Sequence, residues 1–478
     1  MQFLTAAVDE IATCWEDETC VSTEDVIARQ HGRPDPVKTV LAALAHVESL
    51  VTEPHRLLVD MSTSYLTSRA LHIAADHDIA GIIARAGEVD GLHIGELARL
   101  AVVDQDKLCR IMRALASQHV FREVTRERFA NNHVSAALAG DTAFRAHIMM
   151  KGRVHYAASD YLPSVLKGHD LDGGPRDERT AFQRAVDTDL TLFDWMNQEV
   201  PEEDADRRPK TVAKARRLQQ SSTDGPTVTT DDEKIIPSGR AKMVSRPEKT
   251  LFHQAMAGLD RGQRHFYVHE YPWRDLGAGT VVDVGGGIGF FCMQLHAAHP
   301  ALQLVVQDRE PVIEQAASAW AFKHPDALAS GQVQLSAHDF FAPNPVRGAE
   351  VYWLRYILHD WPDTQAGAIL ASIAASMTAS SRLLIANTIV STTVSKGDAP
   401  APLLPNYGRA ASHAHAMDLT MMMMVDGRER TPGEFEALAR GAGLEVVRIW
   451  RGGAGDTLGV VECRLAASDT VGTRDCSY

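Results

Sequence analysis

Apolar residues recur at helical intervals over about the first 150 residues of the chain. In VKTVLAALAHVESLV and SRALHIAADHDIAGIIARA they return every three or four positions, the spacing of an amphipathic helix. Further on, LHIGELARLA and DQDKLCRIMRALA predict two short helices, and HVFREVTRERFA predicts a small hairpin with TRER at its tip. This order is typical of a winged helix, so we expect an N-terminal helical domain of the winged-helix type.

After residue 275 the pattern changes to short β-rich runs separated by helical stretches. These runs are GTVVDVGGG, LQLVVQD, GQVQLSAHDFF, AEVYWLRYIL, SRLLIANTIV, LEVVRIWR and LGVVECRLA. Their alternation with helices predicts an α/β fold with a Rossmann-like, mostly parallel sheet. Ligands of such sheets bind at the carboxyl ends of the strands, so we expect the chemistry there.

A segment of different composition lies between these two regions. Residues from about 203 to 246 combine dense charge with Ser, Thr, Pro and Gly and have almost no aromatic residues, which predicts a flexible insertion. The predicted organisation is a helical winged-helix domain over 1–150, linking helices with the insertion over 151–275, a sheet domain over 276–466 and a tail over 467–478.

Composition and charge exclude several classes of protein. The 478 residues are 45% hydrophobic, and 48 basic against 62 acidic residues give a net charge of −14, so nucleic acid is not an expected partner. We interpret the arginines of the predicted winged helix as solvated charge rather than as a DNA-binding surface; they are Arg110, Arg113, Arg122, Arg126 and Arg128. No apolar run is long enough to span a membrane and no signal peptide is recognisable, so a cytoplasmic location is expected. Six scattered cysteines argue against a disulfide framework and a zinc site.

The segment VVDVGGGIGFF is the first candidate for chemistry. A strand runs into glycines at 285, 286, 287 and 289, which let the backbone turn sharply and approach a ligand. The next strand ends at Asp308, where a carboxylate can bind the ribose hydroxyls of an adenosine. The dinucleotide fingerprint needs a further small residue where Phe290 stands, so NAD is the less favoured cofactor.

Each of these features also has a purely structural explanation. The glycines would serve tight packing of helix on strand, and Asp308 would cap the helix that follows it. Asp339 and Phe340 close the following strand, where an acid and an aromatic ring suit an adenine but equally suit a turn and a core. Coincidence of the glycines and Asp308 at neighbouring strand ends favours a nucleoside site.

The chain resembles a known family at this point. The motifs VVDVGGGIG, LVVQD, HDFF, LRYILHDWPD, RLLIANTIV and DGRERTPGEFEALARGAGL stand in family order over roughly residues 60 to 465. They are similar to those of the class I S-adenosylmethionine-dependent O-methyltransferases of the plant caffeate and fungal phenol or polyketide type. The resemblance implies S-adenosylmethionine as cofactor and dimerisation through the N-terminal region. Positions implied to contact the cofactor are Gly285, Gly287, Asp308, Asp339, Phe340 and Arg355, the last where the family usually has Lys.

The resemblance also implies a general base, His359 in HDWPD. A neutral hydroxyl is a poor nucleophile, and an imidazole can take its proton as the oxygen attacks the activated methyl group. The same resemblance assigns Glu429 the role of orienting the imidazole, and Asn387 stands where the family's second flanking acid is expected. Asn387 cannot supply a negative charge, which weakens the catalytic interpretation.

For the substrate, the resemblance assigns Phe252, Met256 and Asp360 to an aromatic acceptor. Phe252 and Met256 lie four apart on one helical face, where core packing is an equally good explanation. No cluster of metal-ligand spacing surrounds HDWPD, so a metal is not expected. The sequence thus predicts methyl transfer to a hydroxyl, in the first place a phenolic one, of an aromatic or polyketide-type small molecule.

Three alternatives stay open on the sequence alone. One is an oxidoreductase that uses NAD, which would leave HDWPD unexplained. Another is a winged-helix regulator that senses S-adenosylmethionine. Such a protein should bind DNA in a salt-sensitive manner. The third, suggested by Asn387, is a catalytically degenerate methyltransferase fold that acts as a partner of another chain.

Overall fold

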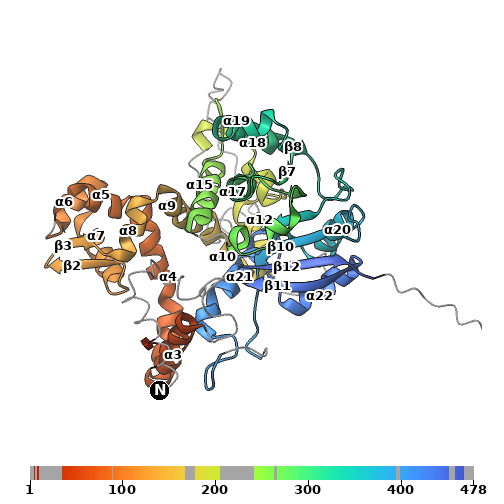
Figure 1. Cartoon of the computed structure of the whole chain (residues 1–478). Helices are drawn as coiled ribbons and strands as arrows, with labels where there is room; N and C mark the ends of the chain where they lie inside the picture. Colours follow the sequence, from red (N-terminus) through yellow and green to blue (C-terminus); the bar gives the residue numbers. More distant parts are fainter. Residues whose placement is uncertain are drawn as a thin grey trace, which may run out of the picture. The chain divides into compact units, whose positions relative to one another are not determined.

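The computed structural model describes residues 35–88, 90–166, 178–204, 242–262, 266–394, 399–451 and 458–467, together with residues 5, 8 and 9. The chain divides into two compact units, which we describe separately (Figure 1). The sheet unit consists of Met1–Val51, His265–Met422 and Asp426–Tyr478, and the helical unit of Thr52–Arg264 and Met423–Val425.

A seven-stranded sheet forms the centre of the sheet unit, with the order β11-β12-β10-β9-β6-β7-β8. The five strands β10, β9, β6, β7 and β8 are parallel to one another. β12 pairs antiparallel with both β10 and β11. All seven predicted strands are therefore present. Their bounds are β6 Thr280–Val284, β7 Gln303–Asp308, β8 Val333–Ala337, β9 Val351–Arg355, β10 Arg382–Thr388, β11 Leu444–Arg451 and β12 Leu458–Leu465.

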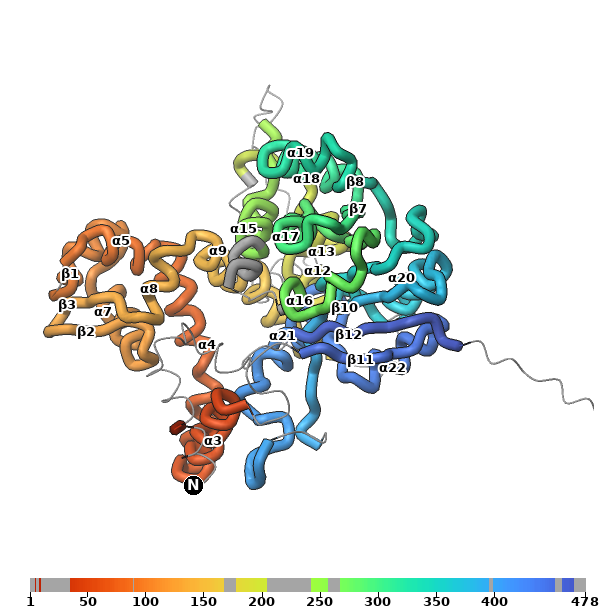
Figure 2. Tube along the Cα trace, viewed as in Figure 1, coloured from red at the N-terminus to blue at the C-terminus, as the bar shows by residue number. Residues whose placement is uncertain are grey.

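Helices cover both faces of this sheet, because successive strand residues point to opposite sides. Val281 packs in one hydrophobic cluster with Phe291 and Trp320, whereas its neighbour Val282 packs in another with Ile369. On the first face lie α16 Phe266–His269, the 3-10 helix η3 Trp273–Leu276, α17 Phe290–Ala298, α18 Glu310–Lys323 and α19 Pro325–Ala329. On the second lie α20 Asp363–Ala374 and α22 Pro432–Gly441 (Figure 2).

The sheet unit also contains helices outside these two layers. Helix α3 Pro36–Val51 packs Ala42 and Ala43 against Leu403, and Arg409 Nη1 donates to Glu48 Oε2 at 2.9 Å. The others are the 3-10 helices η4 Leu358–Asp360 and η5 Gly408–Ala411, and α21 Ser412–Val425, whose last three residues belong to the helical unit. By its contacts α3 thus belongs with the sheet rather than with the helices that follow it in sequence.

The helical unit contains the predicted order of two helices and a hairpin. Helices α6 and α7 are followed by β2 and β3, which join β1 in a small sheet of order β1-β3-β2, so the region is not entirely helical. No helix in the described part of the chain is both long and apolar enough to cross a membrane. The elements up to residue 150 are α4 Pro54–Asp76, α5 Ile79–Ala86, β1 Leu92–His93, α6 Ile94–Ala101, α7 Gln105–Ala116, β2 Phe121–Thr125, β3 Arg128–Asn131, α8 His133–Gly140 and α9 Thr142–Met150.

Three of the five arginines in this winged-helix segment lie close to glutamates. Arg113 pairs with Glu123 at 2.9 Å, Arg128 with Glu88 at 3.0 Å, and Arg126 Nε lies 3.9 Å from a Glu127 carboxylate oxygen. Such pairs neutralise part of the positive field that binding to a phosphate backbone would need.

The rest of the helical unit flanks the predicted insertion. A π-helical turn, η1 Lys151–His155, leads into α10 Tyr156–Ser159, α11 Leu162–Val165, α12 Ala181–Val186 and α13 Leu192–Met196. Strand β4 Glu199–Pro201, the 3-10 helix η2 Glu202–Asp204, strand β5 Met243–Ser245 and α15 Pro247–Gly262 follow. β4 and β5 are antiparallel, with Val200 opposite Val244, so the two ends of the insertion are joined. Residues 205–241 of the predicted insertion and 468–478 of the predicted tail lie outside the described residues.

Candidate active site

The glycine turn between β6 and α17 has the backbone geometry that the sequence predicts. Gly285, Gly287 and Gly289 have φ of +71°, +61° and +83°, a region that residues with a Cβ rarely adopt. A Cβ on Gly285 would lie 2.5 Å from Ile357 Cδ1, whereas a Cβ on Gly287 would meet no atom within 4 Å. The turn therefore packs against the loop that carries His359, and it leaves open space at Gly287.

Asp308, at the end of β7, is tied to this turn. Gly287 N donates to Asp308 Oδ2 at 2.9 Å, and Arg309 N donates to Oδ1 at 2.7 Å. Burial raises the pKa of the Asp308 carboxyl above its ordinary value, and the two backbone hydrogen bonds oppose that shift. Each carboxylate oxygen keeps a further acceptor site, so Asp308 can still accept hydrogen bonds from a ribose.

Phe340 lies beside the glycine turn. Asp339, the residue before it, lies on the surface. Phe340 Cδ1 would be 3.7 Å from a Cβ on Gly285, and its ring meets that of Trp361 edge to face at 6.1 Å. Asp339 is exposed, and its Oδ1 accepts a hydrogen bond from Phe341 N at 3.0 Å. The ends of β6, β7 and β8 thus bring together four of the six predicted cofactor positions.

Arg355 is engaged with aromatic side chains at the end of β9. Its Nη1 donates to Tyr267 Oη at 2.8 Å, and its guanidinium lies 5.8 Å from the centre of the Tyr356 ring. These contacts explain how a guanidinium is held at this position. They do not themselves join Arg355 to the glycine turn.

His359 lies in η4, directly after β9, and is 7% exposed. The chain reaches it through Tyr356, whose φ of +55° is uncommon for a residue with a Cβ and marks a sharp turn. The Tyr356 ring stacks on the imidazole with centroids 5.4 Å apart and an angle of 24°. This stacking fixes one face of the His359 ring, and no sequence pattern pointed to Tyr356.

Two carboxyl groups lie next to the His359 imidazole. Nδ1 lies 2.8 Å from Glu429 Oε1, and Nε2 lies 3.6 Å from Asp360 Oδ1. Burial alone would lower the pKa of His359, but the charges of Asp360 and Glu429 outweigh it, so the pKa of the imidazole is raised. Burial also raises the pKa of Asp360 to about 6. His359 and Glu429, which the resemblance pairs, are thus in contact in the structure, and Asp360, predicted as a substrate contact, lies beside the other ring nitrogen.

Glu429 reaches His359 because the GRERT loop lies directly on the HDWPD loop. Arg428 N donates to His359 O at 2.9 Å, and a Cβ on Gly427 would lie 1.9 Å from that oxygen, so only glycine fits there. Asp418, on α21, accepts a hydrogen bond from Glu429 N at 2.9 Å. Glu429 is 3% exposed, which shields its bond to the imidazole from water.

Arg430, in the GRERT motif, is a positioning residue whose role the motif alone does not reveal. It is 1% exposed, donates to Leu358 O at 2.7 Å and Trp361 O at 2.8 Å, and pairs with Asp363 at 2.9 Å. Its guanidinium thus holds the backbone on both sides of His359. The signal in the sequence is an arginine beside an acid in GRERT. It does not identify the acceptors of Arg430, because two of them are backbone carbonyls.

The remaining predicted residues are not part of this cluster. Asn387, in β10, is 1% exposed, and its Oδ1 has no hydrogen-bond partner among the described residues. Phe252 and Met256, on α15 of the helical unit, pack with Ala146, Met150 and Ala255. Their role toward an acceptor stays a prediction.

The residues at the strand ends fit an adenosine-containing cofactor. An open backbone position at Gly287, a half-buried acceptor at Asp308 and an aromatic ring at Phe340 are what a nucleoside needs. Together with the strand order, they define a class I methyltransferase fold. In the described segments, no group of three or more His, Cys, Asp or Glu is arranged to hold a metal ion.

Comparisons with known proteins identify the family. A family model described as an O-methyltransferase domain matches residues 241–445. O-methyltransferase tpcA of Aspergillus fumigatus is 37% identical over 420 residues, covering 87% of this chain and 84% of the relative. O-methyltransferase gedA of Aspergillus terreus is 38% identical over 432 residues, covering 89% and 86%. The chain therefore belongs to the S-adenosylmethionine-dependent O-methyltransferase family, as the resemblance predicts.

A solved structure agrees in fold. NcsB1, an O-methyltransferase of neocarzinostatin biosynthesis solved with S-adenosylmethionine and 2-hydroxy-5-methyl naphthoic acid, superposes with a TM-score of 0.55 at 22% identity. The match covers 84% of this chain and 96% of NcsB1. The enzyme class and the cofactor are thus established, and the comparisons favour none of the three alternatives.

Proposed function

We propose that this enzyme methylates a phenolic hydroxyl of an aromatic or polyketide-type small molecule, with His359 as general base and without a metal ion. The observation that carries the proposal is the buried 2.8 Å contact between His359 Nδ1 and Glu429 Oε1. A carboxylate at Nδ1 fixes the tautomer with hydrogen on Nδ1, which leaves the lone pair on Nε2. Nε2 is then the atom that takes a proton.

The chain's own groups account for the proton transfer. Bound S-adenosylmethionine supplies a methyl group on a sulfonium that leaves readily. His359 Nε2 takes the hydroxyl proton while the oxygen forms its bond to the methyl carbon and the sulfur–carbon bond breaks. The imidazolium that results is stabilised by Glu429 and by Asp360, which lies 3.6 Å from Nε2. Because these two acids supply negative charge beside His359, the imidazolium does not need a further charge at Asn387.

Asp360 has a second role in the proposal, as a contact for the acceptor hydroxyl. It lies beside Nε2 and is only partly exposed. Phe252 and Met256 are proposed as apolar contacts for the acceptor ring, supported by their place in an apolar cluster.

The test uses labelled S-adenosylmethionine and a panel of phenols, comparing the wild-type chain with His359→Ala. Loss of general-base catalysis should lower kcat by about a hundred- to ten-thousandfold, while cofactor binding measured by calorimetry is retained. Label transfer at the wild-type rate in the variant would refute the base assignment. Failure of the wild-type chain to label any phenol would refute the acceptor class.

We also propose that the enzyme is a homodimer formed through its N-terminal region. Five large apolar side chains on α4 are more than half exposed: Leu58, Val59, Met61, Tyr65 and Leu66. Exposed apolar surface of this extent is unfavourable in water and is typical of an interface. Sedimentation of a Leu58→Asp, Met61→Asp variant should show a monomer, with Thr63→Asp on the same helix as control.

A further inference from the structure

Two buried carboxamides are paired in the sheet unit, beside the predicted cofactor positions. Gln307 is the last residue but one of β7, and Asn344 lies in the loop between β8 and β9. Both side chains are at most 2% exposed. Asn344 Nδ2 donates to Gln307 Oε1 at 2.7 Å, and Gln307 Nε2 donates to Asn344 Oδ1 at 3.2 Å. Each carboxamide therefore donates one hydrogen bond to the other and accepts one from it.

The surroundings of this pair are apolar, which makes a purely stabilising role a poor explanation. Side chains two apart on a strand point to the same face, so Gln307 points to the face on which Val305 packs with Tyr352 and Leu383. Burying two carboxamides costs hydration, and apolar side chains of similar shape can stabilise such a position as well. A reciprocal pair differs from apolar packing in that its two hydrogen bonds are satisfied in only one geometry.

On one side, the pair is joined to the glycine turn. Gln307 O accepts a hydrogen bond from Gly286 N at 2.9 Å. The next residue is Asp308, whose Oδ2 accepts from Gly287 N at 2.9 Å. A shift of Gln307 would therefore displace both the turn and the carboxylate that we expect to bind the ribose.

On the other side, the pair is joined to the loop that carries Phe340. Asn344 Oδ1 also accepts from Val346 N at 3.0 Å, and Asn344 O accepts from Ser376 Oγ at 2.9 Å. Phe340 O accepts from Ser372 Oγ, on α20, at 2.7 Å. The loop is thus attached to α20 and to the residues that follow it, and the carboxamide pair links the attached loop to β7.

We propose that Gln307 and Asn344 are positioning residues for the adenosine half of S-adenosylmethionine. Both side chains are buried, so they act through their neighbours. The pair sets the separation between Asp308, expected at the ribose, and Phe340, expected at the adenine. The proposal uses the established cofactor and depends neither on the acceptor nor on the general base.

The test is calorimetric titration of the full chain with two ligands. One is S-adenosylhomocysteine, and the other is methylthioadenosine, which keeps the adenosine but lacks the amino acid portion. Gln307→Met keeps the length of the side chain and removes its carboxamide. Asn344→Ser can still accept from Val346 N but is too short to reach Gln307. Each variant should bind both ligands about tenfold more weakly, and by the same factor for the two ligands.

The double variant Gln307→Met, Asn344→Ser tests whether the two residues act as one unit. Because either single substitution already breaks the pair, the double variant should bind about as weakly as the single variants. Two independent contributions would instead multiply to about a hundredfold loss, and that result would overturn the proposal.

Ser381→Ala is the matched control for lost stability. Ser381 is buried directly before β10, at the amino end of that strand, and its Oγ donates to Ala349 O at 2.7 Å. Its substitution also removes a buried hydrogen bond, but at the edge of the sheet opposite to the glycine turn. Chemical denaturation should show a loss of unfolding free energy in Ser381→Ala, with the affinity for both ligands retained.

Two further results would overturn the proposal. One is wild-type affinity in a folded Gln307→Met or Asn344→Ser variant, with folding checked by circular dichroism. The other is a loss of affinity for S-adenosylhomocysteine alone, because it would place the effect at the amino acid portion. An equal loss of affinity in Ser381→Ala would show that binding follows stability, and it too would contradict a positioning role.

Discussion

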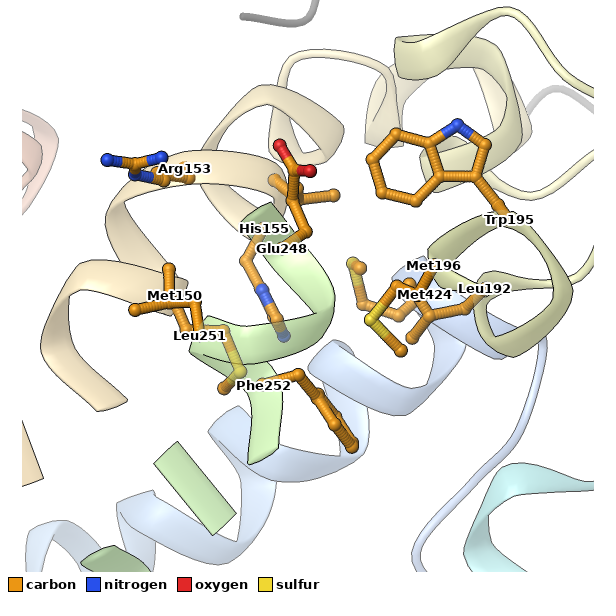
Figure 3. Close-up of a pocket in the computed structure, with 11 residues that line it drawn as sticks. Met150, Arg153, His155, Leu192, Trp195, Met196, Glu248, Leu251, Phe252 and Met424 are labelled. Atoms are coloured by element: carbon orange, nitrogen blue, oxygen red, sulfur yellow. The ribbon is translucent and has the colours of Figure 1, made fainter. Parts of the chain in front are cut away.

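The two units build their functional surfaces in opposite ways. At the sheet edge, polar groups hold one another: Arg430 binds the backbone around His359, and Glu429 is fixed by both the imidazole and Asp418. In the helical unit, a cavity between η1, α13 and α15 is lined mainly by apolar side chains (Figure 3). His155 Nδ1 and Glu248 Oε2 in its lining have no hydrogen-bond partner among the described residues, as is also true of Glu429 Oε2 at the sheet edge. The first arrangement holds the imidazole in one orientation, and the second is lined by methionines, which can repack.

The difference between the hydrogen-bonded sheet edge and the apolar cavity indicates where substitutions are tolerated. The general base proposed at His359 needs a single orientation. The interlocked loops provide it, and they leave no room for a side chain at Gly427. The cavity of the helical unit is lined instead by three methionines, which repack easily. If the comparison holds, substitutions at the sheet edge should have larger effects than substitutions in the cavity.

Removal of the Arg430 guanidinium should have the largest effect on stability. Arg430→Met leaves Leu358 O and Trp361 O without donors in a buried setting, which should lower the free energy of unfolding by about 2–4 kcal/mol. Chemical denaturation measures the loss. Arg428→Met is the control: its side chain is 43% exposed, and its pairs with Asp363 and Glu434 should contribute at most about 1 kcal/mol. Equal losses in both variants would contradict the interlocking of the loops.

Glu429→Gln should slow catalysis with little effect on folding. The amide cannot stabilise an imidazolium with a full charge, so kcat should fall about ten- to a hundredfold. Because the His359 pKa is raised partly by Glu429, and the base must be unprotonated, activity of the wild-type enzyme should rise with pH through a pKa above 6.5. In Glu429→Gln, the rise of activity with pH should occur at lower pH than in the wild-type enzyme. Pre-steady-state rates across pH measure both effects, with exposed Glu436→Gln as control; an unchanged profile would contradict the coupling.

A side chain at Gly287 should weaken cofactor binding rather than folding. Gly287→Ala adds a Cβ where the protein has no atom within 4 Å, so a steric effect reports on the ligand. We expect about a tenfold weaker affinity for S-adenosylmethionine by calorimetry, beside about 1 kcal/mol of backbone strain. Gly331→Ala is the control, because Gly331 has a similar φ of +74° and equally open space around it. It lies before the start of β8, away from the carboxyl ends of the strands. A similar loss of affinity in both would rule out Gly287 as a cofactor contact.

The smallest effect is expected in the cavity. Met424→Leu changes shape but little volume, so the loss of unfolding free energy should stay below about 1.5 kcal/mol. Thermal unfolding measures it, and Met293→Leu in the packed core beside the sheet is the comparison. A larger loss at Met424 than at Met293 would contradict an adaptable cavity.

The sheet and its ligand edge could be predicted because their signals are local. Each strand is a short apolar run, and the glycines before α17 need positive φ whatever surrounds them. The pairing of His359 with Glu429 spans 70 residues, and only the resemblance to a family made it foreseeable.

The rest could not be predicted because it depends on packing between distant segments. Tyr356 stacks on His359 and Arg430 binds backbone carbonyls, interactions that leave no periodic pattern in the sequence. Helix α3 has an ordinary amphipathic pattern, which does not reveal that its Ala42 and Ala43 meet Leu403. The expectation for Asn387 came from its place in the family motif. Its carboxamide oxygen is buried and has no hydrogen-bond partner among the described residues, so the structure assigns it no role.

The short ladder between β4 and β5 has a consequence for how the chain tolerates length. With Glu199 opposite Ser245 and Pro201 opposite Met243, the register of the two strands is set before the intervening residues begin. A brief turn could therefore replace residues 205–241 while α13 and α15 keep their spacing. For the same reason, a reporter domain could be grafted there.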